Sequence, residues 1–527
     1  MGQNVDVLIV GWDGAPPERL EEYAAAGLLP TFASLKDRGA WGRVKSTIPP
    51  VTAPAWASFH TGANPGKHGV FGWAVRQPGT YLPALADSRS LALPTFWERL
   101  SSRLRVGLLG FPLTHPAREI NGFWFPGLLA PPGADGYPPG IVPAALARVP
   151  TWTSTPPEWS KGTDPTAWTQ ELVRSVRAQT ELALFLSHRF HPQVLGIHYQ
   201  ALDTVQHYLW GEELVAEVFK AADQGLAKLL EALEPRLVIL MSDHGMGPVE
   251  GEFHLNTWLW QEGFLTLRRR PGSLIRAGLF KLGWNPRGLG QWAWLGYRIA
   301  RRLRLVHSWS DVLQAETPLA RLIRWGFLSF ADVDWKRTWA YSHSEIGSLL
   351  LNRVGREPQG RVTAADAPRV LRDLRQGLEE LTTPAGEPVV DTLLPGAEVY
   401  RGPYAPLGPD LLLLPRDLRW MGKGLGGFLS HRVLTSAVVR GGHRLEGALL
   451  LAGEGVVRTS PDQAALWDIA PTILAYLGIP IPGWMDGRPL ELFERGVLLI
   501  EREEGEETGR EPYGEDTVER LRGLGYL

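Results

Sequence analysis

The sequence contains no cysteine among its 527 residues. Disulfide bonds, cysteine-ligated zinc, iron–sulfur clusters and thiol nucleophiles are therefore excluded, although the redox compartment stays open. An excess of charge of one sign is also missing, because the formal net charge is −2 and the pI is near 6.7. Such a chain has no overall attraction for nucleic acid, so we expect no nucleic acid duplex as a partner.

Long apolar runs are missing as well. No stretch approaches the roughly 18 apolar residues that a membrane-spanning helix needs. The first residues, MGQNVDVLIVGWDG, show no basic region followed by an apolar one, which argues against a secretory signal. We therefore expect no transmembrane segment and a cytoplasmic location.

Glycine and proline are abundant instead, at 59 and 43 residues, and predict many turns between regular elements. The apolar run 5–10 is typical of a buried parallel strand, with Asp13 just past its carboxyl end. The alternation of strand and helix patterns predicts an α/β fold, a mostly parallel sheet with helices on both faces. We expect helices at 17–26, 166–189, 214–233 and 464–477, and further strands at 41–46, 106–109, 193–199, 237–241, 347–352, 410–414 and 447–452.

The composition changes in the middle of the chain. Residues 263–310 contain no Asp or Glu but ten Lys and Arg residues, interleaved with tryptophans. We interpret this region as an inserted helical cap whose Arg stems cover apolar surface, with peripheral contact to an anionic membrane as the alternative. The expected parts are a first section of the catalytic core at 1–265, the basic cap at 266–334, the second section of the core at 335–495, and an acidic arm at 496–527 that ends in a short helix near 517–521.

Carboxylate and imidazole side chains recur at the ends of the predicted strands. Such nitrogen and oxygen donors, without sulfur, suit Zn²⁺ or Mn²⁺, and their number is about what two ions require. A pair of divalent ions can clamp the attacking and leaving oxygens of an in-line phosphoryl displacement. The candidate ligands are Asp13, Asp203, His207, Asp243, His244 and His443.

The order of these motifs resembles a known family. Between Asp13 and the later ligands come Thr52-Ala53-Pro54, then Thr61-Gly62 and His68-Gly69. Together with Asp203-x-x-x-His207, Asp243-His244-Gly245 and His443, this order is similar to the type I phosphodiesterase and nucleotide pyrophosphatase branch of the alkaline phosphatase superfamily. The resemblance extends from residue 5 to about residue 490, and it implies an alkaline-phosphatase-like fold.

The resemblance also implies roles for individual residues. Thr52 is the implied nucleophile, because direct metal coordination lowers the pKa of an alcohol enough for it to attack phosphorus. Two divalent ions, Zn²⁺ in the first place and Mn²⁺ as the alternative, are the implied cofactors. One ion is expected on Asp203, His207 and His443, and the other on Asp13, Asp243, His244 and the Thr52 oxygen.

The chain departs from the eukaryotic members of the family at one position. They carry an Asn three residues after the nucleophile, whereas this sequence has Ala55. Sulfatases of the same superfamily need Cys or Ser as nucleophile, so Thr52 argues against that chemistry. Thr52 and the basic insert also argue against a cofactor-independent phosphoglycerate mutase.

Other polar residues have weaker signals. We expect His68 to fix its own loop, and we assign His60, His115, His198 and His254 to the core or the surface, because none has a ligand-like partner in the sequence. The segment LNRVGREPQG offers Asn352, Arg353 and Arg356, which orient an anionic substrate or hold a local loop.

The leading hypothesis is a metal-dependent hydrolase of phosphodiester or pyrophosphate bonds that acts through a phospho-threonine intermediate. Its partner would be a small phosphorylated molecule, either a nucleotide or a lipid-linked compound. A phosphomonoesterase, a phosphonate hydrolase and a phosphoryl-alcohol transferase are the enzymatic alternatives. A scaffold that binds anionic surfaces is the non-enzymatic one, and the sequence leaves the oligomeric state open.

Overall fold

The computed structural model describes residues 5–131, 133–160, 162–287, 326–461 and 463–503. A seven-stranded sheet, in the order β2-β18-β8-β1-β7-β5-β6, forms the larger lobe. Only β18 runs antiparallel to its neighbours among these strands, so the predicted mostly parallel α/β sheet is confirmed. The strands are β1 Val7–Trp12, β2 Ala40–Lys45, β5 Val106–Leu109, β6 Gly122–Phe125, β7 Val194–Tyr199, β8 Leu237–Met241 and β18 Glu446–Gly453.

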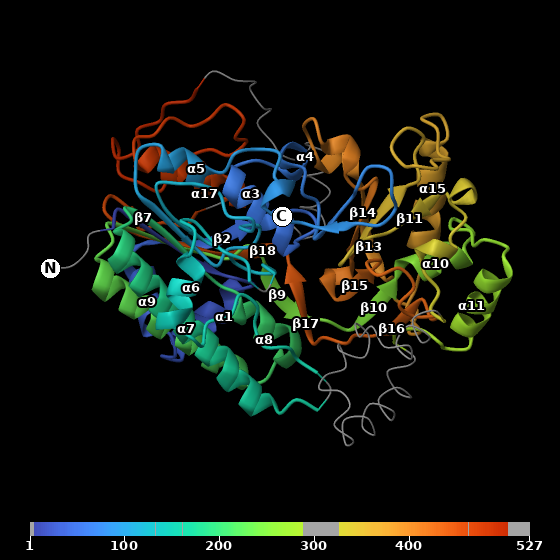
Figure 1. Cartoon of the computed structure of the whole chain (residues 1–527), viewed down its shortest axis with the longest axis horizontal. Helices are drawn as coiled ribbons and strands as arrows, with labels where there is room; N and C mark the ends of the chain where they lie inside the picture. Colours follow the sequence, from blue (N-terminus) through green and yellow to red (C-terminus); the bar gives the residue numbers. More distant parts are fainter. Residues whose placement is uncertain (1–4, 132, 161, 288–325, 462, 504–527) are drawn as a thin grey trace.

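Helices cover both faces of this sheet (Figure 1). β1 shows why the strands are apolar throughout: Leu8 and Val10 enter one hydrophobic cluster, while Val7 and Ile9 enter the cluster on the other face. One face carries α1 Pro17–Ala25, α2 Pro30–Arg38, α6 Ile141–Arg148, α7 Pro165–Phe190, α8 Ala201–Leu209 and α9 Leu214–Leu233, and the other carries α3 Thr52–Thr61, α5 Phe96–Ser101 and α17 Leu466–Tyr476.

A second lobe has its own sheets and core, on the right in Figure 1. Its core is built around Phe253, Tyr341 and Leu374. The division of the chain into parts that the sequence suggested stays a prediction. The lobe comprises an antiparallel sheet of β11 Ala340–Tyr341, β12 Ser348–Leu351, β14 Leu411–Pro415 and β13 Val390–Pro395, a sheet of β15 Trp420–Lys423, β10 Gly251–His254 and β16 Leu434–Ser436, and the helices α10 Leu255–Gln261, α11 Pro271–Lys281 and α15 Ala367–Glu379.

Short elements join the two lobes. The ribbon of β9 and β17 lies between the two larger sheets (Figure 1). Among the described residues, no helix is both long and apolar enough to cross a bilayer. The connecting elements are α4 Pro65–His68, β3 Ala74–Val75, β4 Ala84–Leu85, β9 Gly245–Pro248, α16 Gly396–Val399 and β17 Gly441–Arg444.

The predicted cap is described only at its two ends. α11 begins the insert, and its Ala277 and Phe280 pack into the core of the second lobe beside Phe428. A segment this short cannot bury a hydrophobic core of its own, so it packs against the second lobe. The rest of the cap, with Arg298, Arg301, Arg302 and Arg304, and the helix expected at 517–521 lie outside the described residues.

The sequence assigned His60 to the core or surface, and the structure places it in the core under α3. The indole Nε1 of Trp97 donates to its Nδ1 at 2.9 Å, and its Nε2 donates to the Pro112 carbonyl at 3.2 Å. Burial lowers the pKa of His60 from 6.5 to about 3. Between about pH 6.5 and pH 3 the imidazole therefore stays neutral in the folded protein, whereas the unfolded chain binds a proton there.

Acid should destabilise the protein through His60. As the pH falls, the unfolded state binds a proton at His60 before the folded state does. The contribution of neutral His60 to the free energy of unfolding is therefore complete above pH 6.5 and declines towards pH 3. We expect the free energy of unfolding of the wild type to fall below pH 6 more steeply than that of His60→Gln, by about 1.4 kcal/mol per pH unit. Urea unfolding from pH 7 to pH 4.5 measures the difference. Parallel declines would show that His60 does not contribute.

Candidate functional site

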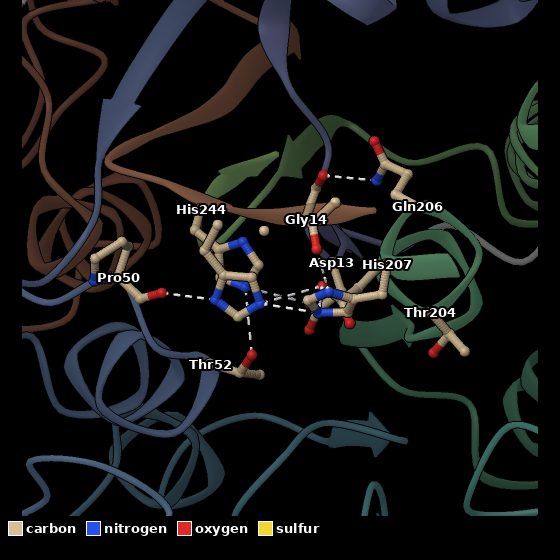
Figure 2. A network of polar contacts seen from close by, with 12 residues as sticks. Asp13, Gly14, Pro50, Thr52, Thr204, Gln206, His207 and His244 are labelled. Carbon is tan, nitrogen blue, oxygen red and sulfur yellow. Dashed lines mark hydrogen bonds and ion pairs between the residues drawn. The ribbon is translucent and has the colours of Figure 1, made fainter. Parts of the chain in front are cut away.

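Three neighbouring strands of the large sheet deliver the candidate ligands. Their order is β8-β1-β7, so the residues after their carboxyl ends meet at one edge of the sheet. Asp13 follows β1, Asp243 and His244 follow β8, and Asp203 lies in α8 directly after β7. β17 adds His443, which pairs with Met246 of β9. Sequence positions hundreds of residues apart thus converge on one site (Figure 2).

The candidate ligands form two groups that share one histidine. Asp13, Asp243 and His244 offer ligand atoms within 4.8 Å of one another, and so do Asp203, His244 and His443. His207, expected beside Asp203, is also close: its Nε2 lies 3.3 Å from Oδ1 of Asp203 and 3.1 Å from Nε2 of His443. All six ligands predicted from the sequence are therefore in one cluster, with His244 between its two halves.

The three imidazoles are oriented in the same way. Each uses Nδ1 to donate to a backbone carbonyl: His207 to Gly441 at 2.8 Å, His244 to Gly245 at 3.0 Å, and His443 to Pro50 at 2.7 Å. These bonds select the tautomer whose Nε2 carries a lone pair facing the cluster. Two such lone pairs repel each other at 3.1 Å, and a cation between them removes the repulsion.

The three carboxylates are held by one oxygen each. Asp13 accepts through Oδ2, Asp243 accepts the Gly14 amide through Oδ1 at 3.2 Å, and Asp203 accepts the Gln200 amide through Oδ2 at 3.1 Å. The second oxygen of each is buried and has no hydrogen-bond partner among the described residues, although Oδ1 of Asp203 lies 3.3 Å from Nε2 of His207. Buried oxygens of this kind are rare in folded proteins, and divalent cations satisfy them.

Electrostatic effects at the site agree with this arrangement. Burial raises the pKa of Asp243 well above its usual value, and the charges of Asp13 and Asp203 add to the rise. Burial raises the pKa of Asp13 too, and it lowers the pKa of His244 well below the usual value. Burial also acts to raise the pKa of Asp203, but its contacts with His207 reverse the sign, so that this pKa is well below normal. Burial acts to lower the pKa of His207, but its contact with Asp203 outweighs burial, so that this pKa is raised.

Thr52 is the first residue of α3 and faces the cluster. Its Oγ1 lies 3.3 Å from Nε2 of His244, and its side chain is almost fully buried. The positive end of the α3 dipole lies at this residue and favours negative charge there. Ala55, one turn into the helix, is buried in the apolar cluster with Trp56. Position 55, where eukaryotic members of the family carry an Asn, is therefore part of the hydrophobic core in this protein.

Gly14 is one of the few glycines whose conformation the site requires. It has a φ of +64°, and a Cβ there would lie 3.0 Å from Oδ1 of Asp203. Its carbonyl accepts the Gln206 side-chain amide at 2.8 Å (Figure 2), and Gln206 is fully buried. The turn that carries Asp13 is therefore tied to the helix that carries Asp203 and His207.

The sequence did not identify His198 and Trp56 as part of the site. His198 donates from Nε2 to Oδ2 of Asp13 at 2.8 Å, and Trp56 donates from Nε1 to the same oxygen at 3.0 Å. Together they turn the other oxygen of Asp13 towards the cluster. A signal was present, because His198 is the polar residue of the otherwise apolar strand β7, which pairs with β1.

His68 and His254, which the sequence analysis placed outside the ligand set, make local contacts. His68 accepts the Val70 amide at 3.2 Å and bonds to Ser58 Oγ at 3.0 Å, so it fixes its own loop as expected. Burial lowers its pKa to about 3. His254 bonds to Thr435 at 3.0 Å in the second lobe.

Asn352 and Arg356, the candidate substrate contacts, lie in the second lobe. Asn352 donates to the carbonyls of Trp335 and Thr338 at 2.7 and 3.0 Å. Arg356 is paired with Glu357 at 2.7 Å and Asp410 at 2.6 Å, and its remaining donors bond to backbone carbonyls. These contacts match the alternative in which the two residues hold a local loop, and a substrate contact stays a prediction.

Comparisons with known proteins identify the fold. Alkaline phosphatase PafA has a TM-score of 0.54 and 15% identity, covering 94% of this chain and 99% of its own. Phosphonoacetate hydrolase from Sinorhizobium meliloti 1021, in complex with phosphonoformate, has 16% identity and a TM-score of 0.48, covering 89% of this chain and 94% of its own. Murine ectonucleotide pyrophosphatase/phosphodiesterase 5 has 12% identity and a TM-score of 0.48, covering 90% and 95%.

Comparison with curated protein sequences gave no match. The family model described as type I phosphodiesterase / nucleotide pyrophosphatase matches residues 7–420. The matched region contains Thr52 and five of the six candidate ligands, and His443 follows it. PafA shows that the chain has an alkaline-phosphatase-like fold. The chain therefore belongs to the type I phosphodiesterase / nucleotide pyrophosphatase family and is a hydrolase.

Proposed function

We propose that the protein hydrolyses phosphodiester or pyrophosphate bonds with two divalent metal ions and with Thr52 as nucleophile. One observation carries the proposal: three imidazole Nε2 atoms converge beside the Thr52 hydroxyl with three carboxylate oxygens that have no hydrogen-bond donor among the described residues. The cytoplasmic location expected from the sequence stays a prediction.

The donor set supports the choice of cofactor. Neutral imidazoles and carboxylates without thiolates suit Zn²⁺, with Mn²⁺ as the alternative. Asp13, Asp243 and His244 would hold one ion, and Asp203, His207 and His443 the other. Because His244 also lies within reach of Asp203 and His443, its loss would disturb both halves of the cluster. Bound divalent ions would supply positive charge to the phosphoryl group and lower the pKa of the nucleophile.

The proposed hydrolysis has two steps, and Thr52 takes part in both. Oγ1 of Thr52 forms a bond to phosphorus while the bond from phosphorus to the leaving oxygen breaks. The N-terminus of α3 stabilises negative charge on the phosphoryl group in this step. The phosphoryl group on Thr52 still carries the second ester or nucleotide part of the substrate. Water then forms a bond to phosphorus while the bond from phosphorus to Oγ1 breaks, a proton returns to Oγ1, and the phosphate monoester leaves as the second product. The contacts of Asp13 with His198 and Trp56 keep its carboxylate in place throughout.

Metal analysis combined with a substrate panel tests the proposal. Protein purified without chelator should contain Zn or Mn, and it should hydrolyse bis(p-nitrophenyl) phosphate or a nucleotide pyrophosphate faster than p-nitrophenyl phosphate. Chelator should abolish activity, and one of the two metals should restore it. A preference for the monoester or for a phosphonate would replace the diesterase assignment. Protein that binds neither metal under any loading would contradict the metal-dependent mechanism.

A further inference from the structure

The helix α11 lies at the outer end of the second lobe, at the right-hand edge of Figure 1. Its inner face is held by apolar packing and by polar contacts. Ala277 and Phe280 enter the core of the lobe, and Ser273 donates to Oδ1 of the buried Asp332 at 2.8 Å. Arg276 donates from Nε to the same carboxylate at 3.0 Å. Because rotation of the helix would break these buried contacts, the fold determines which side of α11 faces outwards.

The outer face of α11 is apolar as well. Leu274, Ile275 and Leu282 have exposed fractions of 57%, 53% and 86%, and Gly278 lies between them on the helix surface. At 3.6 residues per turn these positions form one stripe, opposite the face that enters the core. A helix that is apolar on opposite sides is normally enclosed on both of them. Here three large apolar side chains keep more than half of their surface exposed, which is typical of an interaction surface.

Positive charges flank this stripe at both ends. Arg269 and Arg270 directly precede α11, and Lys281 is in its last turn. All three are exposed, and none forms an ion pair among the described residues. The acids nearest to them in the described chain are Glu262, which pairs with none of the three, and Asp332, which is buried under the helix. We call the exposed set the α11 patch: Leu274, Ile275, Leu282, Arg269, Arg270 and Lys281.

The composition of the α11 patch fits the surface of an anionic lipid bilayer. Leucine and isoleucine side chains can enter the boundary between headgroups and acyl chains, while arginine and lysine stems let the charged ends stay at the level of the headgroups. Anionic headgroups also attract each nearby cation. Nucleic acid would pair with the cations but would leave the leucine and isoleucine side chains in water.

A second copy of the chain fits the α11 patch less well. Around a two-fold axis the patch would meet itself, so each contact would occur twice. Both ends of α11 carry cations, and residues 263–287 contain no Asp or Glu. A parallel or an antiparallel pair of helices would therefore bring like charges together without an acid between them. Charge complementarity favours an anionic partner instead.

We propose that the α11 patch docks the protein on anionic lipid bilayers. Leu274, Ile275 and Leu282 would enter the bilayer surface, and the three cations would contact the headgroups. A patch of this size predicts weak, reversible binding that depends on salt and on lipid charge. The proposal goes beyond the hydrolase function proposed above and does not depend on it. It favours the second of our two interpretations of the basic insert, peripheral contact with a membrane.

Vesicle flotation of the full chain tests the apolar part of the patch. The vesicles are made of phosphatidylcholine, alone or mixed equally with phosphatidylglycerol. We expect the wild type to bind the anionic vesicles at low salt, and Leu274→Asn/Ile275→Asn to bind them at least about tenfold more weakly. Leu499→Asn/Ile500→Asn is the matched control, because it changes another exposed Leu-Ile pair, at 63% and 66% exposure, and should bind like the wild type. No binding by the wild type, or equal binding by all three proteins, would overturn the proposal.

The charged part of the patch is tested by Arg269→Gln/Arg270→Gln. We expect binding to anionic vesicles to weaken about tenfold at low salt and to differ little from the wild type at high salt, because salt screens the attraction to the headgroups. Arg38→Gln/Arg372→Gln removes the same charge at exposed positions elsewhere and should bind like the wild type. Wild-type binding to neutral vesicles that is as tight as to anionic ones would overturn the proposed anionic partner.

A fluorescent label shows whether α11 itself enters the bilayer. The chain has no cysteine, so Ile275→Cys can be labelled at one position with an environment-sensitive dye. We expect its emission to shift to the blue when anionic vesicles are added, while the same dye on Ile500→Cys shows no shift. Vesicle binding without a shift at position 275 would place the membrane contact elsewhere and overturn the assignment to α11.

Light scattering without lipid tests the competing occupant of this face. We expect the wild type and Leu274→Asn/Ile275→Asn to have the same mass in solution. A wild-type dimer that becomes a monomer in this variant would assign the outer face of α11 to a second copy of the chain and overturn the proposal.

Discussion

Replacement of Thr52 by alanine is expected to reduce phosphodiester hydrolysis by about a thousandfold or more. The substitution removes the hydroxyl whose Oγ1 lies 3.3 Å from Nε2 of His244. Folding should be unaffected, because Thr52 is the first residue of α3 and the hydrogen bond that the structure gives to its side chain is the contact with His244 in the site itself. Metal content should stay close to that of the wild type, since six other ligands remain.

Thr52→Ser is the matched control for this experiment. It keeps a hydroxyl at the same position and should retain substantial activity. Acid quenching during turnover of bis(p-nitrophenyl) phosphate should trap a p-nitrophenyl phosphoryl group on Thr52 in the wild type and on the serine in this variant, as peptide mass spectrometry would show. More than about a tenth of wild-type activity in Thr52→Ala would refute the nucleophile assignment.

Removal of individual ligands should separate the two ions. Asp243→Asn weakens the half of the cluster that contains Asp13, and His207→Ala weakens the half that contains Asp203 and His443. We expect each variant to keep one ion and to lose most of its activity, because two-metal displacement needs both. His244→Ala should reduce binding of both ions, since His244 belongs to both halves.

Metal analysis by mass spectrometry and thermal unfolding with added metal provide the measurements. The wild type should gain stability with metal concentration, because bound metal stabilises the folded state by mass action, and the variants should gain less. His188→Gln, an exposed position at the end of α7, is the control. Wild-type stoichiometry in both Asp243→Asn and His207→Ala would contradict the division into two sites.

Much of the larger lobe is predictable because its signals are local. The helix expected at 214–233 and the strands expected at 106–109 and 237–241 have the same limits in the structure, since apolar periodicity and flanking turns act over a few residues. The second lobe was harder to predict from the sequence. Its short strands β10, β15 and β16 were not expected, because β10 pairs with β15 and β16, which are distant in sequence, and periodicity does not indicate which sheet a strand joins.

The sequence alone determined the types of donor available and the nucleophile candidate, because nitrogen and oxygen ligands, the missing cysteine and the motif order are properties of the residues themselves. Only the tertiary structure decided that His244 serves both halves of the cluster, that His198 and Trp56 hold Asp13, and that Leu274 and Ile275 of α11 stay exposed. The physical reason is that hydrogen bonds and ion pairs have a range of a few ångströms, so a side chain's role depends on which distant segments the sheet brings beside it.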